Sequence, residues 1–149
     1  MHATPHALET GLLLAPAPAA SPSPRDVIRG YLDAAERGDW GRAFGFYADD
    51  LHVRIPGRSR FAGEHRGKQA AVDYINAVRE RYRDGTIELE VRDVLASDDR
   101  VMLLVRERFT LEGETVVIRR ANVYRVRDGR ISAIEIYEGD QDVVDQLLS

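Results

Sequence analysis

Cysteine is absent from this sequence of 149 residues. Disulfide bonds, thiol catalysis, cysteine-ligated zinc and iron–sulfur clusters are therefore excluded, because each of them needs a cysteine sulfur. Lysine is nearly absent as well, since Lys68 is the single lysine among 21 basic residues. The 25 acidic residues outnumber the basic ones and give a net charge of −4. This balance argues against nucleic acid or an anionic membrane as a partner, because both bind to concentrated basic surfaces.

No hydrophobic run approaches the roughly 20 residues of a membrane-spanning helix. The run at residues 12–15 is too short for the centre of a signal peptide and follows no Lys or Arg, so we expect a cytoplasmic protein. Residues 1–22 contain four of the six prolines, and such a composition buries too little surface to offset chain entropy. We expect this segment to be a disordered tail and residues 23–149 to form one domain.

Apolar residues recur at helical spacing in three segments, which we predict to be amphipathic helices: residues 23–38, 39–47 and 68–83. Ser23 can cap the first of these helices with its side-chain oxygen. The second helix carries Trp40, the single tryptophan, on its buried stripe. Three helices are therefore expected before the last 65 residues, which are rich in strand-forming residues.

Strands are predicted where β-forming residues lie between turn signals, at residues 51–55, 86–95, 100–111, 115–126 and 130–138. Every residue from Val101 to Val105 is apolar, which indicates that both faces of this strand are covered, one of them by a second subunit. Residues 140–148 are expected to form a closing turn of helix. Helices followed by a long, curved, mainly antiparallel sheet make an α+β domain, with a pocket between the helices and the concave face.

The strand at 115–126 has an unusual inner face. Its apolar residues on that face frame a polar pair, Arg120 and Asn122, with Tyr124 next along the strand. Such a pair is either a hydrogen-bonded network in the core or the floor of a pocket for a mostly apolar ligand. Asn122 could donate to a carbonyl or enolate oxygen, or it could simply bond to its neighbours.

Hairpin register decides which side chains join this pair, because residues opposite one another on paired strands share a face. A two-residue turn at 112–113 places Glu107 opposite Ile118, on the same face as Arg120. A carboxylate in such a place can act as a general base, or it can form a structural salt bridge with Arg120.

The turn at 128–129 leaves two registers open. A two-residue turn places Asn122 opposite Glu135, whereas a three-residue turn brings Ile134 and Ile136 to the inner face. The first register would supply a second acid, and the second register would supply apolar wall.

His52 is the side chain best suited to proton transfer near neutral pH. It lies on the strand at 51–55, where Leu51, Val53 and Ile55 alternate with His52 and Arg54. Alternation alone would point the aliphatic residues inward and His52 outward. The spacings His-x-His and HExxH are absent, so no metal site is expected.

The order of these elements, together with ERGDW at 36–40, ADDLHVRIPGRS at 48–59, HRGKQA at 65–70 and RVRDGRISAIEIYEGDQ at 125–141, resembles the NTF2-like superfamily over about residues 25–149. The SnoaL-like branch, which includes small polyketide cyclases, is the most similar. This resemblance implies a cone-shaped (cystatin-like) α+β barrel, a homodimer formed through the outer sheet face, and cofactor-free acid–base chemistry inside the cone. It also favours the register with Ile134 and Ile136 inside.

The resemblance also bears on single residues. In epoxide hydrolases of the superfamily a Tyr-x-Asn pair on the first strand holds the attacking water, and the matching residues here are His52 and Arg54. The last aspartate of that site matches Ile136, which cannot act as an acid. Epoxide hydrolysis by that route is therefore not expected.

These observations give two functional hypotheses. The first is a cytoplasmic homodimer that binds a small apolar or polyketide-like molecule and isomerises or cyclises it by proton transfer. In this hypothesis His52 is the base, with Glu107 as the alternative, Arg54 and Arg120 hold an oxygen, and Asn122 donates to it. The wall is expected to contain Trp40, Tyr47, Phe61, Tyr124 and Ile136. The second hypothesis is a non-catalytic binding or interaction module of the same superfamily.

Overall fold

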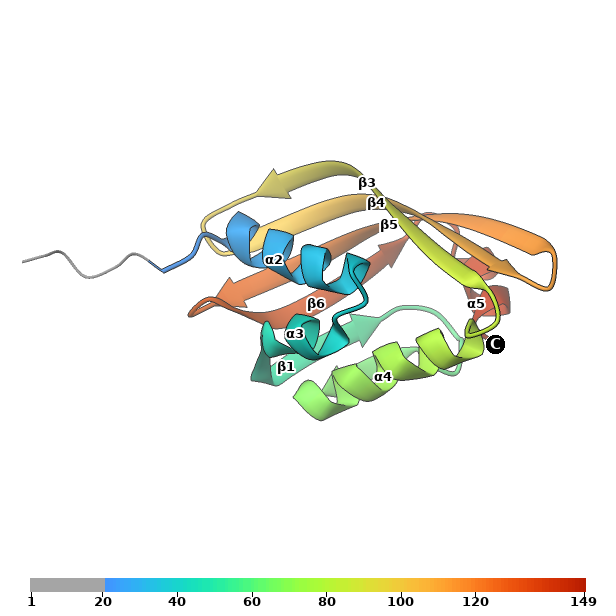
Figure 1. Cartoon of the computed structure of the whole chain (residues 1–149), viewed down its shortest axis with the longest axis horizontal. Helices are drawn as coiled ribbons and strands as arrows, with labels where there is room; N and C mark the ends of the chain where they lie inside the picture. Colours follow the sequence, from blue (N-terminus) through green and yellow to red (C-terminus); the bar gives the residue numbers. More distant parts are fainter. Residues whose placement is uncertain (1–20) are drawn as a thin grey trace, which may run out of the picture.

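A computed structural model describes residues 21–149. The expected tail at 1–22 lies almost wholly outside the described residues. In chain order the elements are α2 (Pro24–Glu36), α3 (Trp40–Gly45), β1 (Tyr47–Ile55), β2 (Gly63–Arg66), α4 (Lys68–Arg81), β3 (Thr86–Ala96), β4 (Arg100–Leu111), β5 (Glu114–Arg127), β6 (Arg130–Glu138) and α5 (Gln141–Leu147). Figure 1 shows a curved sheet with α2 and α3 on its concave side and α4 beside β1.

The first helix begins and ends where its sequence predicts. The Ser23 hydroxyl accepts a hydrogen bond from the Asp26 amide at 3.2 Å, and Asp26 lies in the first turn, near the positive end of the helix dipole. Gly38 follows the helix with a φ of 73°, a conformation that ends helices and that glycine adopts without strain. The buried stripe of α2, which includes Ile28 and Tyr31, packs on the sheet.

The second helix is shorter than predicted. It spans Trp40–Gly45, and Tyr47 is the first residue of β1 rather than the last turn of α3. The sequence pattern was misleading because Tyr47 is buried in either conformation, so its spacing from Phe44 fits a helical stripe as well. A second strand, β2, lies between β1 and α4, where no strand was predicted, and it pairs with β1 at the edge of the sheet.

The strand order is β2-β1-β6-β5-β4-β3. Only β1 and β6 are parallel, and the other four pairs are antiparallel, so the sheet is mixed but mainly antiparallel. The α+β fold predicted from the order of helices and strands is confirmed.

The register of the β4–β5 hairpin is as predicted. Its two-residue turn lies at Glu112 and Gly113, and Glu107 pairs with Ile118 across the strands. Glu107 therefore lies on the concave face of the sheet, diagonal to Arg120 on β5.

The β5–β6 hairpin combines features of both predicted registers. Its turn has two residues, Asp128 and Gly129, both with positive φ, as a turn matched to the twist of the strands requires. The register then shifts by one residue, because Ser132 is an extra residue between the pairs formed by Ile131 and Ala133. A turn of two residues is thus correct, but the expected pairing of Asn122 with Glu135 is wrong.

The bulge at Ser132 places Asn122 opposite Ile136. Ile134 and Ile136 consequently face the concave side, as the second register predicted, although the cause is a bulge and not a longer turn. Arg120 pairs with Glu138 in the same register. The predicted register with Ile134 and Ile136 inside also brings Glu138 to Arg120, although no role was predicted for Glu138.

The central strand β4 is covered on one face only. Val101, Leu103 and Val105 are buried on the concave side, whereas Leu104 on the convex side is 38% exposed. A covered convex face was expected from the apolar run at 101–105, and in the single chain this face is open. A second subunit on it remains a proposal.

Candidate functional site

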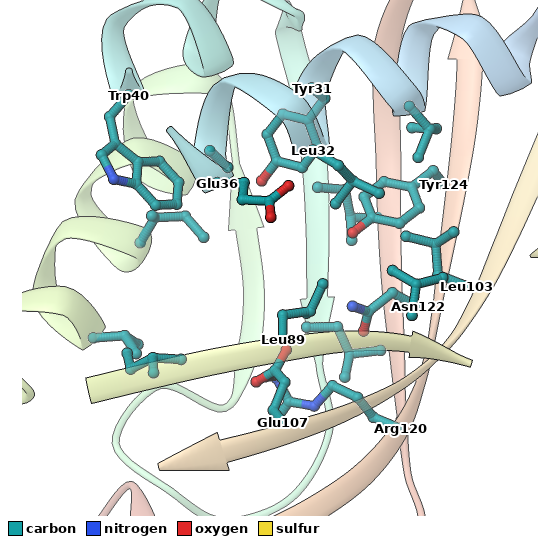
Figure 2. Close-up of a pocket in the computed structure, with 18 of the residues that line it drawn as sticks. Tyr31, Leu32, Glu36, Trp40, Leu89, Leu103, Glu107, Arg120, Asn122 and Tyr124 are labelled. Atoms are coloured by element: carbon teal, nitrogen blue, oxygen red, sulfur yellow. Dashed lines mark hydrogen bonds and ion pairs between the residues drawn. The ribbon is translucent and has the colours of Figure 1, made fainter. Parts of the chain in front are cut away.

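A cavity of about 1030 Å³ lies between α2, α4 and the concave face of the sheet. Its wall is mainly apolar and includes Leu32, Leu89, Leu103, Ile134 and Ile136 (Figure 2). Apolar cavities of about this size suit small organic molecules, with a few polar groups to fix their orientation. The polar groups of the cavity are therefore the candidates for function.

Three buried charges lie together at the floor of the cavity. Glu107 on β4 and Arg120 on β5 line it, whereas Glu138 at the end of β6 contacts Arg120 without lining the cavity. Their side chains are 11%, 8% and 2% exposed, respectively. Figure 2 shows Glu107 and Arg120 lying together on one side of the cavity. We refer to these three residues as the charged floor.

Arg120 is held more closely by Glu138 than by Glu107. Its Nη2 donates a hydrogen bond to Glu138 Oε2 at 2.9 Å, and its Nε lies 2.7 Å from Glu138 Oε1. The Nε–H is not aligned with Oε1, so this second contact is an ion pair without hydrogen-bond geometry. Arg120 Nη1 reaches Glu107 Oε2 only at 3.5 Å. The guanidinium is thus engaged mainly by Glu138.

Burial and like charge both favour a proton on Glu107. Burial raises the pKa of the Glu107 carboxyl above its ordinary value, Arg120 opposes this shift, and the negative charge of Glu138 adds to it. Burial alone would lower the pKa of Arg120, but the two carboxylates raise it, so Arg120 stays charged. A single positive charge faces two carboxyl groups, and Glu107, which has only the longer contact to it, has a raised pKa.

Asn122 lies beside the charged floor on β5. It is 7% exposed, and its Oδ1 has no hydrogen-bond partner among residues 21–149. Figure 2 places it between Arg120 and the Tyr124 side chain, facing the cavity. A buried amide oxygen without a partner is costly, because desolvation is not repaid by a bond. This atom is therefore a candidate acceptor for a ligand.

Three tyrosines form a second polar group, toward α2. The hydroxyls of Tyr31 and Tyr47 lie 2.7 Å apart, and the rings of Tyr31 and Tyr124 are 6.2 Å apart. Burial raises the pKa of all three phenols, which are therefore neutral near pH 7. One of the two bonded hydroxyls donates to the other, and the accepting hydroxyl keeps its own hydrogen for a ligand.

The mouth of the cavity lies at the edge strand β3. Ile87, Leu89 and Val91 of this strand line the cavity and are 38–44% exposed.

Trp40 lines the cavity, as predicted, and its ring packs at a tilt against Phe44 and lies 4.6 Å beneath the Arg79 guanidinium. This contact holds the indole in place.

Two of the predicted catalytic side chains lie outside the cavity. His52 and Arg54 project from the convex face of β1, because Leu51, Val53 and Ile55 take the buried positions of the alternation. His52 Nε2 lies 3.6 Å from Glu64 on β2, too far for a hydrogen bond. His52 is therefore not placed to be the base in this cavity, and Arg54 is not placed to hold an oxygen there.

Phe61 also lies elsewhere than expected. It belongs to a second hydrophobic cluster with Tyr82, Phe109, Ile118, Val144 and Leu148, where α5 packs on the sheet. The other predicted wall residues, Trp40, Tyr47, Tyr124 and Ile136, all line the cavity. Phe61 therefore contributes to the hydrophobic core and not to the cavity wall.

No role was predicted for two residues of the site: Tyr31, which lines the cavity, and Glu138, which contacts Arg120. Tyr31 was assigned to the buried stripe of the first helix, and nothing in that spacing indicates where its hydroxyl points. Glu138 could have been found from the predicted register with Ile134 and Ile136 inside, because strand alternation then brings Glu138 to the same face, opposite Arg120.

Residues 21–149 contain no group of three or more potential metal ligands that lie close together. In the same range no helix has the length and hydrophobicity of a membrane span.

Known structures define the class of this fold. A protein of unknown function with a cystatin-like fold from Xanthomonas campestris superposes with a TM-score of 0.78 at 23% identity, covering 86% of this chain and 99% of that one. An NTF2-like protein from Burkholderia thailandensis gives 0.74 at 21%, covering 86% and 98%. The protein TerC, co-crystallized with polyporic acid, gives 0.70 at 17%, covering 82% and 94%. At these identities the likeness establishes the fold alone, which is NTF2-like.

Sequence comparison then identifies the family. The model of the SnoaL-like domain matches residues 28–134, well over half of the chain, and the protein belongs to this family. The uncharacterized protein Rv0034 of Mycobacterium tuberculosis is 28% identical over 116 residues, which cover 77% of this chain and 88% of that protein. The resemblance inferred from the sequence motifs is thus confirmed.

Proposed function

We propose that the protein binds a small, largely apolar molecule in the cavity and moves a proton on it, with Glu107 as the general base. The observation that carries this proposal is a buried carboxylate on the wall of an otherwise apolar cavity, with a raised pKa and only a 3.5 Å contact to Arg120. A base must have a pKa near the working pH to accept a proton and release it again. Isomerisation or cyclisation of a carbonyl compound fits this requirement.

The proposed step needs no cofactor. Glu107 takes the proton from a carbon beside a carbonyl group, and the electron pair of the broken C–H bond moves onto the carbonyl oxygen as an enolate. A tyrosine hydroxyl of the Tyr31–Tyr47 pair, or the amide of Asn122, donates to that oxygen. In a β,γ-unsaturated carbonyl compound, return of the proton to the γ carbon of the dienolate completes an isomerisation. In a compound with a second carbonyl group, attack of the enolate carbon on that group closes a ring, and Glu107 returns its proton to the alkoxide oxygen that forms.

The fold neighbours support the binding part of this proposal. TerC, which shares the fold, was co-crystallized with polyporic acid, so a protein of this architecture accommodates a small organic molecule. Because His52 lies outside the cavity, we propose Glu107 and not His52 as the base.

Proton transfer can be tested before the substrate is known. The protein is incubated in D₂O with a panel of neutral aryl ketones and 1,3-diketones, and loss of the α-proton signal is followed by NMR. We expect deuterium to enter at least one compound faster than in buffer, and the Glu107→Gln variant to lose this acceleration. Glu135→Gln is the matched control, since Glu135 is exposed on the convex face. Exchange that is unchanged in Glu107→Gln would overturn the role of Glu107.

A non-catalytic binding module is the second candidate. It is favoured by the absence of histidine from the cavity wall and by the pairing of Glu107 with Arg120, which resembles a structural salt bridge. Ligands that bind in the panel without any deuterium exchange would support this candidate.

We further propose that the protein forms a homodimer through the convex face of the sheet. Leu104, Val117 and Tyr137 are exposed there, next to partly buried Met102 and Val123 on the same face. A Leu104→Arg variant is expected to shift the mass measured by light scattering from two chains to one. A wild-type mass of one chain would refute the dimer.

A further inference from the structure

We propose that Glu138 determines the charge of the ligand: by occupying the Arg120 guanidinium it closes the cavity to carboxylates and leaves a floor that accepts neutral molecules bearing a hydroxyl or other hydrogen-bond donor. This inference rests on the proposed function, because it concerns the ligand of the same cavity. Nothing in the family match assigns a role to Glu138.

The Arg120 guanidinium is already engaged by Glu138. An exposed arginine in an apolar cavity would normally bind a carboxylate through two parallel N–H groups. In this protein Glu138 already takes two nitrogens of Arg120, at 2.7 Å and 2.9 Å, from the directly opposite position on β6. The Glu138 side chain is 2% exposed, so water does not compete for it. The remaining Nη1 faces Glu107 at 3.5 Å. An incoming carboxylate would therefore have to compete with two carboxyl groups for the guanidinium.

The net charge of the floor also disfavours a carboxylate ligand. The charged floor holds two carboxyl groups and one guanidinium, so it is negative whenever both carboxyls are ionised. Bringing a third carboxylate into this dry region would add repulsion to the cost of desolvation.

The other charged residues that line the cavity lie at its rim. Three of them are positive and three are negative, and all six are exposed: Arg25, Arg29, Arg79, Asp33, Glu36 and Glu88. Water and salt screen such charges far more than they screen the floor. The rim therefore does not reverse the preference set by the charged floor.

Two hydrogen-bond acceptors of the cavity wall are available to a ligand. Asn122 Oδ1 is buried without a partner among the described residues, and the carboxylate of Glu107 has only the long contact to Arg120. Both atoms are acceptors and both belong to residues of the cavity wall. A ligand that satisfies them must donate a hydrogen bond. The class that fits floor and wall together is a neutral, largely apolar ring system or chain that bears an alcohol, enol or phenol group.

Two compounds with the same ring system provide a direct test, 2-naphthol and 2-naphthoate. Near neutral pH the phenol keeps its proton and the acid is ionised. Dissociation constants are measured by isothermal titration calorimetry for the wild type and three variants: Glu138→Gln, Glu107→Gln and Glu135→Gln. Glu135→Gln serves as the control, because Glu135 lies three residues away on the convex face.

In the wild type we expect 2-naphthol to bind about tenfold or more tightly than 2-naphthoate. In Glu138→Gln the guanidinium is released, and the affinity for 2-naphthoate should rise by about tenfold, which corresponds to about 1.4 kcal/mol. Glu107→Gln also removes a negative charge but leaves Arg120 held by Glu138, so it should gain much less for 2-naphthoate. Glu135→Gln should bind both compounds as the wild type does.

Two outcomes overturn the inference: equal affinity of the wild type for both compounds, or no gain for 2-naphthoate in a folded Glu138→Gln variant. Circular dichroism establishes whether that variant is folded, and if it is not, the comparison in the wild type decides alone. A gain in Glu107→Gln as large as in Glu138→Gln would also overturn it, because charge and not occupancy of Arg120 would then be responsible. Failure of the deuterium exchange would refute the proposed base without affecting these binding results.

Discussion

Charged side chains are buried on the concave face of the sheet and exposed or half-exposed on its convex face. On the concave face Glu107, Arg120 and Glu138 are nearly inaccessible to water and lie in contact with one another. On the convex face His52 and Glu64 form a half-exposed pair at 3.6 Å, and Arg119 is exposed next to Arg120 in the same strand. Neighbouring residues of one strand thus experience very different surroundings. Position on a face, and not residue type, decides which charges can affect stability and chemistry.

The physical reason is the cost of desolvation. A buried ion pair repays that cost only while both partners are present, and removing one partner leaves an uncompensated charge in the interior. A pair on the surface keeps its hydration, so its loss changes little. The following predictions test this contrast in order of decreasing effect.

Loss of Arg120 should be the most damaging change. Arg120→Leu leaves Glu107 and Glu138 without their counter-ion, and a loss of about 3–5 kcal/mol in the free energy of unfolding is expected. Arg119→Leu, on the other face of the same strand, should leave stability nearly unchanged. Urea denaturation followed by circular dichroism measures both. Equal losses in the two variants would contradict the contrast between the faces.

Truncation of a leucine on β4 should show the same contrast for apolar residues. Leu103 is 1% exposed, and Leu103→Ala should cost about 2–4 kcal/mol, because a cavity replaces a packed side chain. Leu104 is 38% exposed on the convex face, and Leu104→Ala should cost much less in the single chain. Denaturation at several protein concentrations separates the effects. A large, concentration-dependent loss for Leu104→Ala would instead show that this face is covered by a second subunit.

The pH dependence of stability should reveal Glu107. Burial raises the pKa of Glu107 in the folded protein above its ordinary value of 4.5. The folded state therefore holds this proton more tightly than the unfolded state, and the associated stability is present at low pH and lost as pH rises through the raised pKa. Glu107→Gln should accordingly gain stability relative to the wild type as pH increases from about 4.5. The expected gain is smaller than the loss in Leu103→Ala, and thermal denaturation across this range measures it. A difference that is independent of pH would argue that Glu107 is not perturbed.

The smallest effect is expected at His52. Its contact with Glu64 is long and half-exposed, so His52→Ala should change stability by about 0.5 kcal/mol or less. Binding of 2-naphthol and any deuterium exchange should remain as in the wild type, because His52 lies outside the cavity. A loss of exchange in this variant would restore His52 as a candidate base.

Much of the fold could be predicted from local signals. The Ser23 cap, the helical stripes and the two-residue turn at 112–113 each depend on a few adjacent residues, and they located α2, α4 and the β4–β5 register correctly. The short strand β2 could not be predicted, since four residues at a sheet edge carry too weak a pattern.

The candidate site was only partly predictable. Glu107 was found because its position follows from a hairpin without irregularities. Glu138 was missed although the predicted register with Ile134 and Ile136 inside also places Glu138 on that face. What the sequence did not indicate is the cause of this register, because no residue type marks the bulge at Ser132. For His52 the alternation of β1 pointed outward, and the resemblance to another branch of the superfamily pointed inward. The alternation proved correct.

The bulges have a consequence for the size of the cavity. Along β6 the inward positions step by three residues from Ile131 to Ile134, and along β3 they step by three from Val91 to Val94, because Ser132 and Arg92 are extra residues in their ladders. Such insertions bend a strand and increase its twist. The volume of the cavity therefore depends on two inserted residues, Arg92 and Ser132, and neither of them lines the cavity. Removing Ser132 would keep the same side chains facing inward while flattening the wall behind them, so that the capacity of the cavity could change without any change in its lining.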